Sequence, residues 1–264
     1  MSKVCFIIGA SSGIGLATAA RFLEDGYTVI NGSRTECELS GVRNYSVDVA
    51  TPKTIYAAAK DIAREFGRID VFIYSAGYSM AAPVEFAKQE DYRYLFDVNF
   101  FGVIEGVRAV LPTMKKQGTG TIVVVSSIGG VLPIAFDSFY SSSKAAVNML
   151  VRELNLELAP HKIRAISVMP GGTQTRFTFK RNVYSEEAAG LYADRMDNAV
   201  ERIAKSEQEG LLPEKVAETI FFVATAKKSP ELVAVGVKNK AYHMMDRIMP
   251  RIETRMLLRL KYKV

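Results

Sequence analysis

The chain has 264 residues, of which 48% are hydrophobic and 23% charged, a balance typical of a globular protein with a sizeable core. Its 19 glycines and nine prolines exclude the collagen-like and low-complexity classes, and no run of 18 apolar residues predicts a membrane span. The net charge of +6 arises mostly in the last 35 residues, so we expect no nucleic-acid partner. Two cysteines and two histidines exclude a disulfide framework and indicate no metal site, as in a cytoplasmic protein.

Short apolar runs alternate with longer helical patterns from residue 4 to about residue 235. The predicted strands are Val4–Ile8, Thr28–Asn31, Asn44–Val47, Asp70–Tyr74, Thr121–Ser126, Arg164–Met169 and Glu231–Val235. The predicted helices are Ile14–Glu24, Pro52–Phe66, Glu90–Leu111, Ser138–Leu158 and Pro213–Ala226. Nearly continuous apolar strands separated by helices predict a single-domain α/β Rossmann fold, with a doubly wound parallel sheet of about seven strands and helices on both faces.

We expect this domain to cover residues 1–235 and a basic C-terminal helical extension to cover residues 236–264. Residues 171–212 contain no predicted strand and follow the end of one, so they are expected to form a lid or substrate loop. In the extension, basic residues recur among apolar ones, which predicts an amphipathic helix starting near Pro250. This helix either docks on the domain, at the pocket or at a subunit contact, or lies on a membrane surface. Its arginines are Arg247, Arg251, Arg255 and Arg259.

A glycine-rich turn follows the first predicted strand and opens the first predicted helix. Glycines allow a tight turn and a close backbone approach, while the free N–H groups of a helix N-terminus bind a pyrophosphate. At the first strand–helix junction of an alternating chain, this turn favours a dinucleotide over a purely structural role. Its residues are Gly9, Ser11, Ser12, Gly13, Ile14 and Gly15.

The end of the second predicted strand indicates which dinucleotide binds. An NAD site needs an acidic residue about 20 positions after the glycines, where it accepts a hydrogen bond from the ribose 2′-hydroxyl. The chain has Ser33 and Arg34 there, and no acidic residue between Val29 and Thr35. A guanidinium suits a 2′-phosphate, so we predict NADP(H).

Tyr140 and Lys144 are four residues apart, which places them on one face of a helix. This spacing alone is uninformative, because Tyr56 and Lys60 have it too. The two pairs differ in context, because Ser127 precedes Tyr140 and lies just past the fifth predicted strand, where a catalytic group is expected. We therefore take Tyr140 and Lys144 as the functional pair.

Together these motifs resemble the short-chain dehydrogenase/reductase family over roughly residues 3–235. Asp48-Val49 resembles the family's adenine-contacting pair, and Ser75-Ala76-Gly77 resembles the end of its motif after the fourth strand. Asn99 matches its helix asparagine, and Pro170-Gly171, with Thr173 nearby, resembles the turn that holds the nicotinamide amide. The resemblance implies a cofactor site made of Gly9, Ser11, Ser12, Gly13, Ile14, Gly15, Ser33, Arg34, Asp48, Val49, Ala76, Gly77, Asn99, Tyr140, Lys144, Pro170, Gly171 and Thr173.

The resemblance also implies hydride transfer between the nicotinamide of NADP(H) and a carbonyl carbon. Tyr140 is expected to donate a proton to the carbonyl oxygen, or to remove it in the reverse direction. Lys144 is expected to lower the pKa of Tyr140 and to hold the nicotinamide ribose. Ser127 is expected to hydrogen-bond the same oxygen, and Asn99 to hold a water in a proton relay.

Three departures from the family pattern stand out. Ile8 replaces the threonine that usually precedes the first glycine. Tyr74 and Ser75 replace two asparagines, so the fourth strand must be stabilised differently. The usual ending is replaced by Val235-Gly236-Val237 and basic residues, which resembles the branch of hydroxysteroid, retinoid and acyl-dihydroxyacetone-phosphate reductases.

The segments expected to line the substrate pocket are mostly apolar, and flexible methionine suits a bulky hydrophobic ligand. We expect a bulky ketone or secondary alcohol, a hydroxysteroid or bile acid first and a retinoid or lipid ketone as the alternative. Arg176, Lys180 and Arg181 either pair with a carboxylate or phosphate of the substrate or are solvated loop charges. The predicted pocket residues are Tyr78, Met80, Gly129, Val131, Arg176, Phe177 and Tyr184.

One alternative from another functional class is a non-catalytic NADP-binding sensor or scaffold. The set of Ser127, Tyr140 and Lys144 argues against it, because a pure binder does not need Tyr140. The resemblance further implies a homodimer or homotetramer in the cytoplasm, and the basic extension leaves a peripheral membrane contact open.

Overall fold

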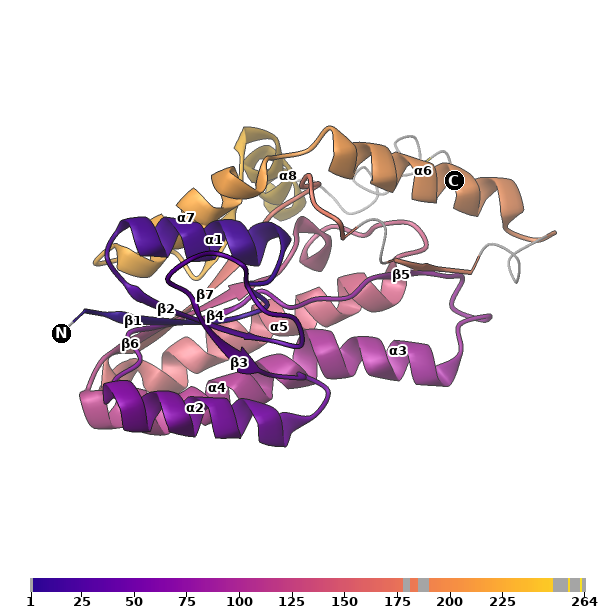
Figure 1. Cartoon of the computed structure of the whole chain (residues 1–264). Coiled ribbons are helices and arrows are strands. Elements are labelled where there is room, and N and C mark those ends of the chain that lie inside the picture. The colour runs from indigo at the N-terminus through magenta and orange to yellow at the C-terminus, as the bar shows by residue number, and fades with distance from the viewer. Residues whose placement is uncertain (1, 178–180, 185–189, 249–255, 257–261, 263–264) are drawn as a thin grey trace.

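The computed structural model describes residues 2–177, 181–184, 190–248, 256 and 262 (Figure 1). Seven parallel strands form one sheet in the order β3-β2-β1-β4-β6-β7-β9. The predicted seven-stranded, doubly wound sheet is therefore confirmed, and each strand lies within two residues of its expected bounds. The strands are β1 Val4–Ile8, β2 Thr28–Ser33, β3 Arg43–Ser46, β4 Val71–Tyr74, β6 Gly120–Val125, β7 Ile163–Met169 and β9 Leu232–Ala234.

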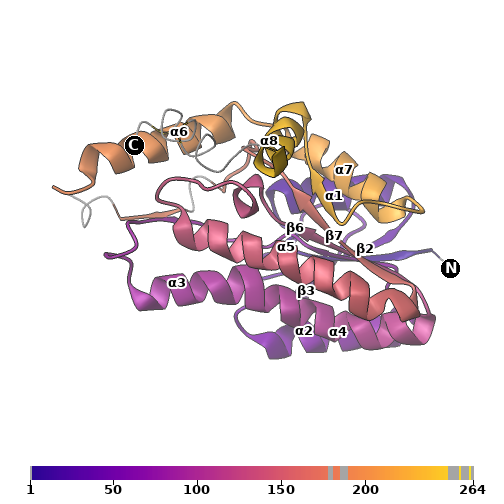
Figure 2. The same ribbon diagram turned by 180° about the vertical axis from the view of Figure 1, so that it is seen from behind.

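Helices cover both faces of this sheet. α1 and α7 lie on one face, and α2, α4 and α5 lie on the other, as both views show (Figures 1 and 2). The helices are α1 Gly13–Glu24, α2 Pro52–Phe66, α3 Gln89–Phe96, α4 Gly102–Gln117, α5 Ser138–Leu158, α6 Ala193–Gln208, α7 Pro213–Thr225 and α8 Val237–Ile248.

The alternation of side chains along β1 explains why the strand is apolar throughout. Phe6 and Ile8 belong to the core under α2, α4 and α5, whereas Cys5 and Ile7 belong to the core under α1 and α7. Successive side chains of a strand point to opposite faces, so a strand covered on both faces has no polar positions. Burial of both sides fixes the register of the sheet and therefore the positions of the strand ends.

The order of the strands reverses beside β1. The chain runs outward from β1 through β2 to β3, then returns to β4 on the other side of β1 and continues outward to β9. The crevice between the carboxyl ends of two strands at such a reversal is where open α/β sheets bind ligands. The fold thus places the functional site at the carboxyl ends of β1 and β4.

The predicted helix Glu90–Leu111 is interrupted by a π-helical turn at Asp97–Phe101, between α3 and α4. The Tyr74 hydroxyl, at the end of β4, donates a hydrogen bond of 2.6 Å to the carbonyl oxygen of Val98 in this turn. A Cβ at Gly102 would lie 2.3 Å from the same hydroxyl, so a glycine is needed there. Tyr74 thus joins the fourth strand to the π-helical turn.

Residues 171–212, which were expected to contain no strand, contain a short strand and a helix. Asn182–Val183 forms a two-residue strand, β8, which pairs in parallel with β5, Met80–Ala81. The 16-residue helix α6 follows, and its Met196 and Ala199 are fully buried. These two residues and Ile203 are spaced at three and four positions, a helical pattern that the sequence interpretation overlooked.

The C-terminal extension begins with α8, which starts 13 residues before the expected helix. The helix expected near Pro250, with Arg251, Arg255 and Arg259, lies outside the described residues. Tyr262 is described, is buried and lines the pocket reported below. This contact supports docking of the extension on the domain.

Two absences hold for the part of the chain that the structure describes. No helix there is both long and apolar enough to cross a membrane. No group of three or more histidine, cysteine, aspartate or glutamate side chains is arranged to hold a metal ion there.

Candidate active site

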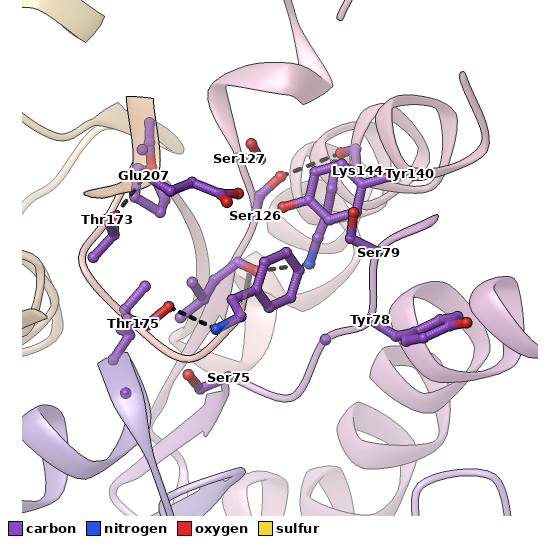
Figure 3. A pocket seen from close by; sticks show the side chains of 18 of the residues that line it. Ser75, Tyr78, Ser79, Ser126, Ser127, Tyr140, Lys144, Thr173, Thr175 and Glu207 are labelled. Carbon is purple, nitrogen blue, oxygen red and sulfur yellow. Dashed lines mark hydrogen bonds between the residues drawn. The ribbon is translucent and has the colours of Figure 1, made fainter. Parts of the chain in front are cut away.

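A pocket of about 870 Å³ lies at the carboxyl ends of the central strands. Its lining includes the residues that directly follow β1, β2, β4, β6 and β7, which are Gly9, Arg34, Ser75, Ser126 and Pro170. This is the crevice at which the strand order reverses, so the fold and the pocket indicate the same place. Figure 3 shows some of the side chains that line this cavity.

The glycine-rich turn forms one wall of the pocket. Gly9 has φ +94°, and a Cβ there would lie 2.8 Å from the backbone nitrogen of Ala76. A Cβ at Gly15 would lie 2.0 Å from the carbonyl oxygen of Gly9. Gly15 therefore stays behind the turn, outside the lining, whereas the other predicted members line the pocket. These members are Gly9, Ser11, Ser12, Gly13 and Ile14.

The N-terminus of α1 suits an anion. Within the described residues no side-chain hydrogen bond from Ser12 caps this helix, and its first turn contains no acidic residue. The amide of Ala10 is held by Asn31 Oδ1 at 3.1 Å, which fixes the turn against β2. An uncapped helix N-terminus beside a glycine cradle fits the pyrophosphate of a dinucleotide. The residues present therefore fit this cofactor.

The end of β2 and the segment after β3 form the neighbouring wall. Arg34 is exposed, lines the pocket and has no acidic partner among the described residues. The Ser33 hydroxyl donates to Asn31 Oδ1 at 2.7 Å, so it is already used within the protein. Asp48 and Val49 also line the pocket, and their contact with an adenine stays a prediction.

Ser127, Tyr140 and Lys144 meet in the pocket although they come from two elements. Ser127 follows β6, its Oγ accepts the Gly129 N–H at 3.0 Å, and its hydroxyl is hydrogen-bonded to that of Tyr140. Lys144, one turn after Tyr140 on α5, donates to the Val125 carbonyl at 3.0 Å. Its Nζ lies 5.6 Å from the centre of the Tyr140 ring. Figure 3 shows all three around the same cavity.

The pKa of Tyr140 is shifted in the direction opposite to the expected one. Its ring is partly exposed in the pocket, but desolvation of the hydroxyl raises its pKa, and the hydrogen bond from Ser127 opposes this only in part. The net shift is upward, opposite to the lowering expected from Lys144. Burial lowers the pKa of Lys144 to about 8, which leaves most of it charged at pH 7. At neutral pH Tyr140 therefore holds its proton and can donate it.

Asn99 lies in the π-helical turn and is fully buried. Its Oδ1 accepts the Tyr78 N–H at 2.8 Å, and its Nδ2 donates to the Tyr78 carbonyl at 2.8 Å and to Ser143 Oγ at 3.1 Å. It does not line the pocket itself. The structure thus gives Asn99 a positioning contact with the loop after β4, and its part in a proton relay stays a prediction.

The loop after β7 is held between α6 and α8. A Cβ at Gly172 would lie 1.9 Å from the carbonyl oxygen of Ser206, and one at Gly171 would lie 2.5 Å from Asn239 Oδ1. Glycines are therefore needed for this close approach. The remaining predicted cofactor contacts also line the pocket here and across from it, namely Pro170, Gly171, Thr173, Ala76 and Gly77.

The predicted substrate residues divide into two groups. Tyr78, Arg176 and Phe177 line the pocket. Met80 and Tyr184 instead belong to a separate buried cluster, and the Tyr184 hydroxyl is hydrogen-bonded to Asp91. They therefore do not line the cavity, contrary to what the sequence had led us to expect.

Gly129 and Val131 also lie outside the lining. Gly129 is buried behind Ser127, within the short 3-10 helix Ile128–Gly130. This helix shifts the pocket wall along the chain, so that Leu132, Pro133 and Ile134 form it instead.

Four lining residues were not predicted as a group. The Ser79 hydroxyl donates to Asp137 Oδ1 at 3.4 Å, and Arg181 Nε donates to Ser79 Oγ at 3.1 Å. Arg181 also forms an ion pair of 2.6 Å with Glu207 of α6. Ser79, Asp137, Arg181 and Glu207 thus form one polar cluster on the pocket wall. Of these four residues, Asp137 could have been suspected from the sequence, because it stands three residues before Tyr140.

The ion pair corrects the expectation that Arg181 meets an anionic substrate. Its side chain is 3% exposed and is already paired with Glu207, so it is not available for a substrate carboxylate or phosphate. Lys180 lies outside the described residues. Arg176 is exposed at the pocket and remains the candidate for such a pair.

The chain is similar to known proteins over most of its length. The family model described as short chain dehydrogenase matches residues 3–187. A 3-ketodihydrosphingosine reductase of Bacteroides thetaiotaomicron is 38% identical over 89% of this chain and 88% of the relative. A 3-oxoacyl-acyl-carrier-protein reductase of Thermotoga maritima is 33% identical over 86% of this chain and 92% of the relative.

Solved structures agree with this similarity. A short-chain dehydrogenase from Streptomyces avermitilis superposes with a TM-score of 0.83 at 29% identity, covering 100% of this chain and 98% of that one. The chain therefore belongs to the short chain dehydrogenase family and is an oxidoreductase of that family acting on CH–OH groups.

Proposed function

We propose that the protein is an NADP(H)-dependent reductase of a bulky lipid ketone. The observation that carries this proposal is the protonated Tyr140 hydroxyl, hydrogen-bonded to Ser127 in a pocket that also contains an anion-binding turn. A proton donor beside a dinucleotide cradle supports carbonyl reduction, because a reduced carbonyl oxygen needs a proton.

The choice of NADP(H) rests on the end of β2. The exposed Arg34 guanidinium would bind the 2′-phosphate, and the N-terminus of α1 would bind the pyrophosphate. When bound, NADPH supplies a hydride to the carbonyl carbon. Pro170, Gly171 and Thr173 would hold the nicotinamide end.

The residues of this chain handle the carbonyl oxygen. Ser127 and Tyr140 hydrogen-bond it, which fixes the carbonyl carbon in place and stabilises the charge that develops on oxygen. Tyr140 then donates its proton, so that C=O becomes CH–OH. The Lys144 ammonium beside the ring stabilises the resulting phenolate, and the carbonyl of Val125 holds this ammonium in place.

The substrate class rests on the lining and on the relatives. The lining near Tyr140 includes Leu132, Pro133, Ile134 and Phe177, which suit an apolar body. The Bacteroides relative is named for 3-ketodihydrosphingosine, a long-chain lipid ketone, which favours this class. A hydroxysteroid or bile acid, the first expectation from the sequence, has the support of the apolar lining alone and is the second candidate.

A substrate panel tests the proposal. Purified protein with NADPH or NADH is offered long-chain 3-ketones, oxosteroids, oxo bile acids and retinal, and oxidation of the cofactor is followed by absorbance. We expect NADPH-dependent turnover with kcat/KM highest for long-chain ketones. A higher kcat/KM for oxosteroids would move the substrate to the second class. Tight NADPH binding without oxidation by any ketone would favour a non-catalytic NADP sensor.

A further inference from the structure

The C-terminal extension contributes one described side chain to the wall of the pocket. Tyr262 is 6% exposed and belongs to the lining of the cavity. Met256, which is described in the same extension, is 62% exposed and does not belong to the lining. The tyrosine ring is thus covered where it meets the pocket, and neither the glycine-rich turn nor the proton donor accounts for its presence there.

The surroundings of Tyr262 place it on the Tyr140 side of the cavity. The pKa of Tyr262 is raised to about 12, mainly by burial and to a smaller extent by Asp137 and by Tyr242 of α8. The Asp137 carboxylate stands three residues before Tyr140 and acts on the Tyr140 hydroxyl as well. Tyr262 and Tyr140 therefore lie near the same carboxylate, at the end of the cavity where the substrate carbonyl is expected.

The cofactor end of the cavity lies elsewhere along the sheet. Gly13 and Arg34, which are expected to hold the pyrophosphate and the 2′-phosphate, follow β1 and β2. Asp137 precedes α5, after β6, and Tyr242 lies on α8, after β9. In the sheet, β2 lies on one side of β1, and β6 and β9 lie on the other. A side chain near Asp137 and Tyr242 is therefore positioned to face the substrate and not the adenosine half of the cofactor.

The wall that contains Tyr262 lies beyond the part of the chain that the family model matches. That model ends at residue 187, so Ser127, Tyr140 and Lys144 lie within it and Tyr242 and Tyr262 follow it. The matched part of the chain supplies the proton donor and the expected cofactor contacts. The wall is thus a feature of this chain that the family model does not describe.

The Tyr262 ring is suited to bounding an apolar substrate. With a pKa of about 12 it keeps its proton at pH 7, so it presents an uncharged aromatic face to the cavity. The cavity of about 870 Å³ has to take a dinucleotide as well as the substrate, which limits the space left for the substrate. In a hydrophobic pocket one methylene more or less changes relative rates about 10- to 200-fold. One ring at the boundary is therefore enough to select ketones by shape.

We propose that Tyr262 is a specificity-determining residue that bounds the substrate end of the pocket and excludes ketones with a wide group beside the carbonyl. This inference rests on the proposed reduction of lipid ketones, and it narrows that class to ketones with an unbranched chain at this position. Tyr140 and Ser127 hold the ketone oxygen, and the ring of Tyr262 limits the width available next to it.

The test compares two ketones of equal carbon number, one with linear chains on both sides of the carbonyl and one with a cyclohexyl group attached to the carbonyl carbon. We expect the wild-type protein to have the higher kcat/KM for the linear ketone. Tyr262→Ala should raise the ratio of the two kcat/KM values, cyclohexyl over linear, at least about 10-fold and mainly through KM. Tyr262→Leu should give an intermediate ratio, and Tyr262→Phe should keep the wild-type ratio because it keeps the ring.

Met256→Ala is the control for a shortened side chain in the same extension. Met256 is exposed and lies outside the lining, so this variant should leave the ratio unchanged. The Kd for NADPH, measured by fluorescence titration, should be the same in the wild-type protein and in all four variants, because Gly13 and Arg34 are untouched. An unchanged Kd also shows that the variants are folded.

Ligand binding tests the same claim without turnover. The affinities of the two ketones for the complex with NADP⁺, which has no hydride to transfer, are measured by isothermal titration calorimetry. The ratio of the two Kd values should shift in the same graded order, from Tyr262→Phe through Tyr262→Leu to Tyr262→Ala.

The possible outcomes separate this inference from the proposed function. An unchanged ratio in Tyr262→Ala, or equal losses for both ketones, would overturn the selective role of Tyr262 and leave ketone reduction standing. A loss of NADPH affinity as large as the change for the ketones would also overturn it. Graded binding of the two ketones without their reduction by the wild-type protein would overturn the proposed function and leave the role of Tyr262 standing. Absence of binding by either ketone would overturn both.

Discussion

Replacing Tyr140 with phenylalanine is expected to lower kcat for ketone reduction by about 10²- to 10⁴-fold, the usual contribution of a positioned proton donor. The variant keeps the ring and loses the hydroxyl that is bonded to Ser127. NADPH affinity should change little, because the glycine turn and Arg34 are untouched. Steady-state kinetics and a fluorescence titration with NADPH measure the two effects separately.

The chain supplies a matched control in its second Tyr-x-x-x-Lys pair. The Tyr56 hydroxyl is hydrogen-bonded to Glu105 at 2.6 Å on the protein surface, outside the pocket lining. Tyr56→Phe should leave kcat within a factor of two. Comparable losses in Tyr56→Phe and Tyr140→Phe, or full activity in both, would contradict the assignment of the proton donor.

Replacing Arg34 with alanine is expected to raise the KM for NADPH about 10- to 100-fold and to leave the KM for NADH nearly unchanged. Hydrogen bonds to a charged group contribute about 1.5–3 kcal/mol, and each 1.4 kcal/mol corresponds to a factor of ten. Arg34 lines the pocket at the end of β2, and the Ser33 hydroxyl beside it is already bonded to Asn31. Initial rates against both cofactors give the two KM values.

Arg43→Ala is the control for this charge change. Arg43 lies on β3, pairs with Glu65 at 2.7 Å and does not line the pocket. It should leave both KM values within a factor of two. An equal loss of NADPH affinity in the two variants would show a general charge effect, and an unchanged NADPH KM in Arg34→Ala would contradict a 2′-phosphate contact.

The sheet could be predicted from the sequence because its pattern has one physical cause. Residues such as Phe6 and Ile7 point to opposite faces, and both faces are covered, so the central strands β1 and β4 are uninterrupted apolar runs, whereas the edge strand β3 is polar and mostly exposed. The glycine turn was predictable for a similar local reason. Gly9 and Gly15 approach backbone atoms that no Cβ could tolerate.

Features that depend on contacts between distant segments were missed. The π-helical turn forms where Tyr74 reaches the Val98 carbonyl, a contact that has no signature in the helical sequence itself. β8 has only two residues, too few to show any periodicity. By contrast, α6 could have been found, since its buried Met196 and Ala199 follow the helical spacing.

In the candidate site, too, residues with a local sequence context could be predicted, and contacts between distant segments could not. Ser127, Tyr140 and Lys144 stand in recognisable positions relative to their own strand and helix, and the structure brings them together. Asp137 was visible beside Tyr140, but the polar cluster around it includes Arg181 and Glu207, which lie 44 and 70 residues further along the chain. Only the tertiary structure shows that Arg181 pairs with Glu207 and bonds the Ser79 hydroxyl that contacts Asp137.

Transfer of deuterium from NADPH to a lipid ketone tests the central claim most directly. A long-chain ketone is incubated with the protein and NADPH carrying deuterium at both hydrogen positions of nicotinamide C4, and the alcohol is analysed by mass spectrometry. The account predicts an alcohol with one deuterium on its carbinol carbon, formed by the wild-type protein and at least about 100-fold more slowly by Tyr140→Phe. An alcohol without deuterium, or no alcohol from any ketone tested, would contradict it.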